Sequence, residues 1–258
     1  MAVFLVSDLH GAHEELRKTL PPGATLVLLG DLINFLDYSD MSGILTEVFP
    51  VEAVQEVSDL RAVGDYEKAR SLIRERAAGR EEEIREIIGR RVREQYEVVF
   101  SALPNPTYLI LGNVDSPAVA HAFAAEHRGV HEVDGQIVVI DGERFGFIGG
   151  ALPTPLRVAG EISEEEMRAK IEGLGETDVL CSHIPPAIPE LCYDTLARHS
   201  EQGSVDLLRY IEDVQPRRAY FGHVHQPLVS VLRVGRTVCI NVGYFRATQR
   251  AFPHHPQP

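Results

Sequence analysis

Polar side chains that can bind metal ions follow several apolar segments of the sequence, each at the point where the segment ends. The segments have the length and the Val, Ile and Leu content of buried strands. In open α/β sheets, ligand sites lie beyond the carboxyl ends of the strands. Loops that leave adjacent strands would therefore bring these side chains into one cluster. The residues concerned are Asp8, His10, Asp31, Asn113, Asp115, His183, His223 and His225.

The donor atoms of this cluster define which ions it can bind. Without Asp115, the set holds two aspartates, an asparagine and four histidines, which offer only oxygen and imidazole nitrogen atoms. These atoms suit divalent Mn, Fe, Co, Zn or Ni better than ions that prefer thiolates. Seven ligands are too many for one ion that keeps an open position, but they suit two ions that share a carboxylate. Two such ions about 4 Å apart can hold a bridging hydroxide and bind both oxygens of an in-line phosphoryl displacement.

Each part of the set, taken alone, has an ordinary structural explanation. Asp8 and His10 can form a turn with a helix N-cap, and a single His183 is more often a hydrogen-bonded core histidine than a ligand. His223 and His225 are more informative, because residues two apart on an extended segment project to the same side. The ordered combination at successive strand ends is what favours a metal site.

The motifs, taken in order, resemble those of the calcineurin-like metallophosphoesterase superfamily. The resemblance covers about residues 3–243 and leaves the segment 52–100 outside the shared pattern. It implies an α/β fold, a four-layer α-β-β-α sandwich with two central mixed sheets, to which the segment 52–100 adds a helical insertion. The matching motifs are Asp8-Leu9-His10, Gly30-Asp31, Gly112-Asn113-Val114-Asp115, His183 and Gly222-His223-Val224-His225.

The resemblance also implies how the ligands are divided between two metal ions. Asp31 would bridge the two ions. Mn²⁺ is the first choice among the candidate metals, ahead of Fe, Zn, Co and Ni. The other implied ligands are Asp8, His10 and His225 for the first ion, and Asn113, His183 and His223 for the second.

Val114 departs from the family motif, which commonly has histidine at this position. In the family that histidine contacts the phosphate or protonates the leaving group, and the acid that follows orients it. Valine can do neither, so Asp115 is expected to cap the turn or to contact the metal-binding residues without binding a metal ion itself. His13 is a candidate substitute for the proton donor, although a surface position on the first helix is the more ordinary explanation. Loss of a general acid typically costs about 10²–10⁴-fold in rate.

These features predict a metal-dependent hydrolase in which a metal-bridging hydroxide attacks a small phosphate ester, most simply a phosphodiester with a good leaving group. Asn113 would help to orient the phosphate oxygens, and Arg246 could approach the phosphate or remain solvated. Some smaller phosphodiesterases of the superfamily also lack the histidine. A phosphomonoesterase or a nuclease of the same fold remains an alternative. So does a catalytically weak scaffold for protein interactions.

Composition narrows the range of partners. The chain has 258 residues, a formal net charge of −13 and a pI near 5.3, so duplex nucleic acid and anionic membranes are disfavoured partners. No apolar run approaches the roughly 20 residues of a membrane-spanning helix. The N-terminus lacks the basic segment and the cleavage site of a secretory signal. Three cysteines, an odd number, do not suggest a disulfide framework. We therefore expect a cytoplasmic protein.

The order of apolar and polar segments predicts one domain over residues 1–250. Short strand spacing after residues 136 and 218 predicts hairpins, and hence mixed sheets. Ser204 is placed to cap the last of the expected helices. These helices lie at 13–20, 164–174 and 204–214.

The segment 52–100 and the end of the chain differ from the rest. Apolar residues recur at helical spacing between Ile84 and Val99, so two or more helices are expected in 52–100, interrupted near Gly79. A solvated layer over one sheet is the favoured interpretation, and a cap over the site or a homo-oligomer contact is the alternative. The tail 251–258 is expected to be disordered, with His254 outside any site.

Overall fold

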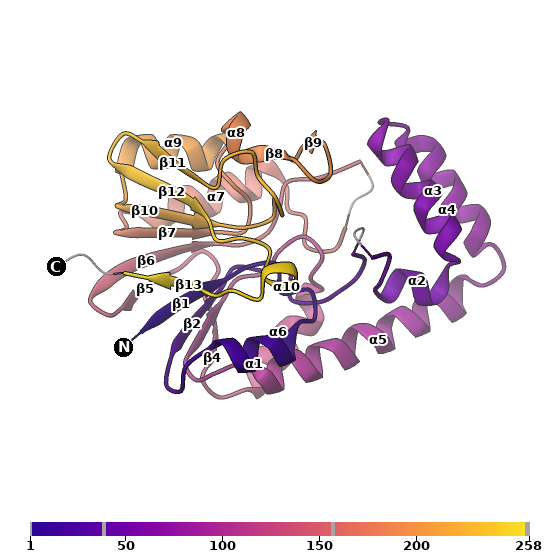
Figure 1. Ribbon diagram of the computed structural model, residues 1–258, viewed down its shortest axis with the longest axis horizontal. Helices are drawn as coiled ribbons and strands as arrows, with labels where there is room; N and C mark the ends of the chain where they lie inside the picture. The colour runs from indigo at the N-terminus through magenta and orange to yellow at the C-terminus, as the bar shows by residue number, and fades with distance from the viewer. Residues whose placement is uncertain (1, 38–39, 156–157, 256–258) are drawn as a thin grey trace.

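The computed structural model describes residues 2–37, 40–155 and 158–255, and it shows two β-sheets packed face to face with helices on both outer sides (Figure 1). The first sheet holds, in spatial order, β13 (Phe252–His254), β1 (Val3–Val6), β2 (Thr25–Leu28), β3 (Thr107–Leu109) and β4 (Val130–Glu132). The second holds β11 (Val231–Val234), β12 (Thr237–Asn241), β10 (Arg218–Phe221), β7 (Val179–Ser182), β6 (Glu143–Ile148) and β5 (Ile137–Ile140). A small hairpin joins β8 (Tyr193–Asp194) to β9 (His199–Ser200).

Both sheets are mixed, as the sequence predicted. Strands β1 to β4 run parallel, and β13 adds an antiparallel edge to β1. In the second sheet β12, β10, β7 and β6 are parallel. The outer strands β5 and β11 close antiparallel hairpins with β6 and β12, which confirms the two predicted hairpins. Parallel pairing puts the carboxyl ends of the central strands at one edge of each sheet, where the polar motifs follow.

Three apolar cores hold the layers together. Large side chains such as Leu5, Leu29, Phe145 and Phe147 fill the space between the two sheets and are fully buried. The outer face of the first sheet is covered by α1 (His13–Thr19), α6 (Pro117–Glu126) and the C-terminal half of α5 (Glu81–Ala102). The second sheet is covered by α7 (Glu164–Leu174) and α9 (Val205–Val214). The four-layer α-β-β-α prediction is confirmed.

Local sequence explains where the helices on the second sheet begin. Ser204 accepts a hydrogen bond from the Leu207 backbone N–H at 3.1 Å, so it caps α9 as predicted. Ser163 caps α7 in the same way, through the Glu166 N–H. Two short helices complete this part of the chain, α8 (Pro189–Cys192) and α10 (Phe245–Thr248).

The helical insertion is longer than predicted and does not form a layer over one sheet. It contains α2 (Ile44–Val48), α3 (Val51–Ala62), α4 (Tyr66–Ala77) and α5, with a break at Gly79 where it was expected. Within the insertion, the C-terminal half of α5 packs on the first sheet, and Ile44 of α2 joins the same core. Helices α2, α3 and α4, which we call the helical arm, stand away from the sandwich (Figure 1). The arm packs around a small core of Val48, Phe49 and Val54, to which Ile84 of α5 also contributes.

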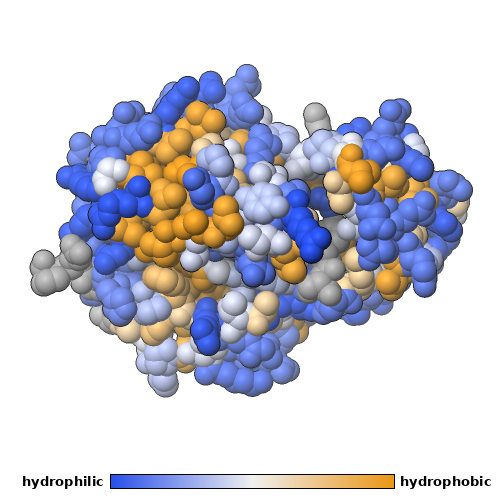
Figure 2. Space-filling view, turned by 45° about the horizontal axis from the view of Figure 1, so that its top comes forward, coloured by the Kyte–Doolittle hydropathy of each residue, from blue (hydrophilic) through white to orange (hydrophobic). Residues whose placement is uncertain are grey.

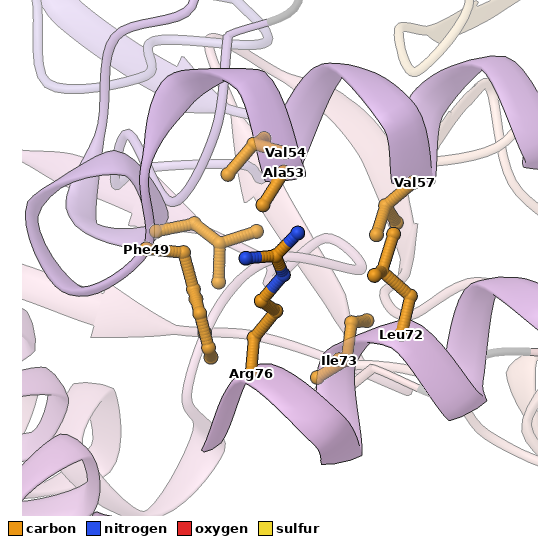
Figure 3. A pocket seen from close by; sticks show the side chains of 8 residues that line it. Phe49, Ala53, Val54, Val57, Leu72, Ile73 and Arg76 are labelled. Atoms are coloured by element: carbon orange, nitrogen blue, oxygen red, sulfur yellow. The ribbon is translucent and has the colours of Figure 1, made fainter. Parts of the chain in front are cut away.

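The surface of the arm is largely hydrophilic, whereas hydrophobic residues gather on one face of the sandwich (Figure 2). Inside the arm, Phe49, Val57 and Leu72 line a small apolar hollow between α3 and α4, into which Arg76 reaches (Figure 3). Arg70 of α4 donates a hydrogen bond to the Pro155 carbonyl of the sandwich.

Within the described residues, no helix combines the length and the apolar character that crossing a membrane requires.

The prediction of a disordered tail is wrong for residues 252–254. This segment forms β13 and pairs with β1, with Val3 opposite His254. His254 is 5% exposed, and its two ring nitrogens lie 3.0 Å from the Tyr220 hydroxyl and 2.7 Å from the Glu143 carboxylate. These buried partners belong to distant strands, so the local sequence of the tail does not reveal them. Residues 256–258 of the predicted tail lie outside the described residues.

Candidate metal centre

Asp8, His10 and His225 form a first trio of metal-binding side chains. Asp8 and His10 leave the end of β1, and His225 follows β10 of the other sheet. One donor atom from each residue can be chosen so that the three atoms lie within 4.8 Å of one another. Asp8 Oδ1 lies 3.6 Å from His225 Nε2, too far for a strong hydrogen bond but close enough for two ligands of one ion.

Asp31, His183 and His223 form a second trio by the same criterion. They follow β2, β7 and β10, so this trio also joins the two sheets. Asp31 faces both trios: its Oδ1 lies 3.6 Å from His183 Nε2, and its Oδ2 lies 3.8 Å from His10 Nε2. The carboxylate therefore lies between the two trios.

Asn113 joins the second trio through its side-chain oxygen. Oδ1 lies 3.0 Å from His183 Nε2 and 3.0 Å from His223 Nδ1. The structure thus brings all seven predicted metal-binding side chains into one cluster, divided between two groups as the resemblance implied.

The backbone at the cluster adopts conformations that L-residues rarely use. Asp8, His10, Asp31 and His223 have positive φ angles of 54°, 41°, 55° and 66°. Such strained residues cost free energy and persist where the surrounding structure fixes them, often at functional sites. The neighbouring glycines let the strand ends approach, because a Cβ on Gly112 or Gly222 would overlap the side chain of Asp31 or of Ser7 and Asp8.

Burial controls the charge of the donor groups. It lowers the pKa of His10 and of His223 to about 4, so both rings are neutral and keep a lone pair for a ligand. Burial and the neighbouring carboxylates of Asp8 and Asp115 raise the pKa of Asp31 well above its usual range. Burial acts in the same direction on Asp8, but interactions with His225 hold the pKa of Asp8 below its usual range.

Two donor atoms of the first trio have no hydrogen-bond partner among the residues that the structure describes. Asp8 Oδ1 and His10 Nε2 are both buried, and an unpaired buried polar atom is costly. A divalent cation between them would remove that cost for the carboxylate and the imidazole together. The residues present therefore fit two divalent ions bound by oxygen and nitrogen.

Asp115 and Val114 have structural contacts at the cluster. Asp115 is fully buried and accepts hydrogen bonds from the backbone N–H groups of Gly112, Asp31 and Leu32 and from the Tyr96 hydroxyl. It caps the turn, as expected for an acid without its histidine partner. The Val114 N–H donates to Asp31 Oδ1 at 3.0 Å, so the backbone at this position helps to hold the shared carboxylate.

His13, the candidate substitute for the proton donor, begins α1. Its Nδ1 lies 2.8 Å from the Gly11 carbonyl oxygen, and no hydrogen bond or ion pair among the described residues joins it to the seven side chains. The geometry gives no support for a catalytic role of His13.

Two residues around the cluster, Tyr244 and Glu201, were not recognised from the sequence as parts of the site. The Tyr244 ring stacks on His225, and Glu201 Oε2 lies 3.7 Å from His223 Nε2. Arg246, which the sequence left either near the phosphate or solvated, is partly buried and pairs with Asp37 and Asp40. Tyr244 follows the last strand of the second sheet within three residues, which is the signal that could have indicated it.

One family model and several solved structures are similar to this chain. The model of the calcineurin-like phosphoesterase family matches residues 1–227. A search of curated proteins found no significant match. Among solved structures, a protein of unknown function from Aquifex aeolicus is similar with 15% identity, coverage of 98% of this chain and 95% of the other, and a TM-score of 0.41.

Two further solved structures are similar at the same level. A putative 5′-nucleotidase from Staphylococcus aureus has 12% identity and a TM-score of 0.45, with coverage of 94% of this chain and 48% of the other. This chain therefore spans about half of that protein. GAP50 of Plasmodium, described as an anchor in the inner membrane complex, has 11% identity and a TM-score of 0.42, with coverage of 94% and 71%. These similarities are too low to transfer function, but the family model covers most of the sequence, and the chain belongs to the calcineurin-like phosphoesterase family.

Proposed function

We propose that the protein is a dinuclear metal-dependent phosphodiesterase. The observation that carries this proposal is the position of Asp31, whose two oxygens face different trios of metal-binding side chains. A buried carboxylate in this position has one obvious use, which is to be shared by two cations. Mn²⁺ is our first choice of metal, because the donor set of carboxylate, amide and imidazole accepts it.

When bound, two divalent ions would make a nucleophile available from water at neutral pH and offset the negative charge of the phosphate. The protein side chains supply position and shape. His183 and His223 would hold the second ion with Asn113, whose amide nitrogen remains available to donate to a phosphate oxygen. The left-handed backbone at Asp8 and His10 fixes the ligands of the first ion before substrate arrives.

The preference for a diester with a good leaving group follows from Val114. The side chain at this position has no proton to donate, and Asp115 is already occupied by four donors. A substrate whose leaving group departs without protonation would lose least from this arrangement. We therefore favour small activated phosphodiesters over phosphoproteins, and a monoesterase or a nuclease becomes an outcome of the test.

Two features bear on the partners and the location of the protein. The three cysteines are buried and free, which fits a reducing compartment, and we propose the cytoplasm. The helical arm stands away from the sandwich, and we propose it as the surface for a homo-oligomer contact. Size-exclusion chromatography with light scattering tests the latter, and a monomer at all concentrations would reject it.

The test of the function is a hydrolysis screen of the Mn²⁺-loaded protein. We expect bis-p-nitrophenyl phosphate to be cleaved with a higher kcat/KM than p-nitrophenyl phosphate. The screen also measures kcat/KM for 2′,3′- and 3′,5′-cyclic nucleotides. Asp31→Asn and His183→Ala should each lose at least about 10³-fold of kcat/KM, because each removes a ligand of the proposed centre. His131→Ala, at an exposed position on β4, is the matched control and should retain activity.

Other outcomes decide between the alternatives. A higher kcat/KM for the monoester would contradict the diesterase proposal and indicate a phosphomonoesterase. Turnover that survives in Asp31→Asn and in His183→Ala would exclude this centre as the source of activity. Protein that binds two metal ions but turns over no phosphate ester would favour the interaction scaffold.

A further inference from the structure

One aromatic ring contacts both imidazoles of the first trio. The Tyr244 ring stacks on His225 with ring centroids 3.9 Å apart and planes 9° from parallel. The edge of His10 meets the same ring, with centroids 5.5 Å apart and an interplanar angle of 87°. Tyr244 is 6% exposed, so the ring is enclosed by the protein. No ring contact among the described residues links it to the histidines of the second trio.

A chain of buried and partly buried hydrogen bonds fixes this ring. The Tyr244 hydroxyl donates to Asp37 Oδ2 at 2.5 Å, and Arg246 Nε donates to the same oxygen at 2.8 Å. Arg246 Nη1 then donates to the His10 carbonyl oxygen at 3.0 Å, and Nη2 to Ser42 Oγ at 2.9 Å. The chain starts at the tyrosine hydroxyl and ends at the backbone of His10, so hydrogen bonds connect the ring to a residue of the first trio.

The segment that carries Tyr244 and Arg246 is fastened to the strand end of the first trio. The Phe245 N–H donates to the Ser7 carbonyl at 3.1 Å, and the Arg246 N–H to the Asp8 carbonyl at 3.3 Å. This segment begins α10 and lies beyond residue 227, where the match to the family model ends. The chain thus completes the surroundings of the first trio with residues that the family pattern does not include.

His225 has the greatest need for such support. Its side chain is 31% exposed, against 1% for the Asp8 side chain beside it, and it stands on a loop after β10. A ligand that rotates freely loses conformational entropy when it binds a metal ion. A ring stacked on one face removes that freedom in advance, and outer partners of metal-binding histidines typically contribute 10–100-fold to affinity.

We propose that Tyr244, anchored by Asp37 and Arg246, is a positioning residue that holds His225 and His10 for the first metal ion and thereby sets the affinity of that site. The inference rests on the proposed function, since it assumes that the two trios bind metal. It predicts an effect on one site of the pair, which a general loss of stability would not produce.

The test is a Co²⁺ titration of the metal-free protein, followed by its visible absorption. His10→Ala and His183→Ala identify which dissociation constant belongs to which site. We expect Tyr244→Leu to weaken the first site about 10–100-fold and to change its absorption bands, while the second site changes by less than about 3-fold. Tyr244→Phe keeps the stacked ring but loses the bond to Asp37, and should weaken the first site by a smaller factor.

Tyr108→Leu is the matched control. Tyr108 also stacks on a histidine, His131, with centroids 5.3 Å apart, but it lies on β3 away from both trios. This variant should bind Co²⁺ at both sites with wild-type affinity. Thermal unfolding of the metal-free variants separates a local effect from a loss of folding.

The outcomes separate this inference from the function on which it rests. If the wild-type protein binds no Co²⁺ at either trio, the result would contradict both the proposed function and the inference that rests on it. Two bound ions in the wild type with unchanged first-site affinity in Tyr244→Leu would overturn the inference alone. Equal weakening of both sites, with a lower Tm of the metal-free protein, would also overturn it. If Tyr244→Leu does not fold, unchanged first-site affinity in Tyr244→Phe overturns it.

Discussion

Val114 differs from the family motif in its side chain, while the backbone contacts at this position stay in place. Its backbone N–H still holds Asp31 Oδ1, and Asn113 still reaches two histidines. Only the atoms beyond Cβ differ from the family motif. Sequence alone could identify this departure, because the flanking Gly112 and Asp115 fix the register of the motif.

We expect Val114→His to restore a proton donor. The increase in kcat/KM should be largest, about 10–100-fold, for aryl phosphodiesters with poor leaving groups and small for p-nitrophenyl esters. Rates across a series of leaving phenols provide the measurement, because a general acid flattens the dependence on leaving-group pKa. Val114→Ala, which changes the space but adds no donor, should leave the slope unchanged. An equal gain on every substrate would contradict the missing-acid explanation.

At the scale of elements, helices and strands with a strong local signal agree with prediction, and elements held by distant partners do not. The ranges of α7 and α9 follow from apolar spacing and from Ser163 and Ser204 as caps. Strand β13 carries no such signal, because its three residues gain their partners from β1 and from the second sheet. Apolar spacing predicted a helix in α5, but it could not show that α3 and α4 pack on each other instead of on a sheet.

The strand β13 gives a stability prediction. His254→Ala would leave the Tyr220 hydroxyl and the Glu143 carboxylate without that partner in a buried position, and we expect it to lower the free energy of unfolding by about 2–3 kcal/mol. Urea denaturation measures this loss. His255→Ala is the matched control: the neighbouring residue is exposed, so its change should stay within about 0.5 kcal/mol. Equal effects of the two variants would mean that β13 does not stabilise the fold.

At the scale of the molecule, the candidate centre joins the two sheets. Asp8, His10, Asp31 and Asn113 come from strand ends of the first sheet, and His183, His223 and His225 from those of the second. Side chains from both sheets must therefore stay in register for the cluster to exist. Metal ions bound at this cluster would link the sheets in the folded state only.

Metal removal should accordingly destabilise the whole protein. At a free Mn²⁺ concentration about 100 times the dissociation constant, binding adds about 2.7 kcal/mol per site to the free energy of unfolding. For a chain of this size we expect each occupied site to raise Tm by about 5–10 °C over the protein in EDTA. Differential scanning fluorimetry measures the shift. Asp31→Asn should lose most of it and His131→Ala none, and a shift that survives in Asp31→Asn would place the stabilising ions elsewhere.

The sequence by itself determined the donor set and its order along the chain, because these depend on residue types next to apolar runs, which are local facts of the chain. The resemblance of its motifs to the family implied the four-layer fold and the departure at Val114. Only the tertiary structure decided that Asp31 faces both trios, that Tyr244 stacks on His225, that Arg246 is held by Asp37, and that His254 is buried. Each of these contacts joins residues far apart in sequence or on opposite sides of a turn. The distances between these residues follow from how the two sheets pack, and the spacing of residues along one strand does not predict that packing.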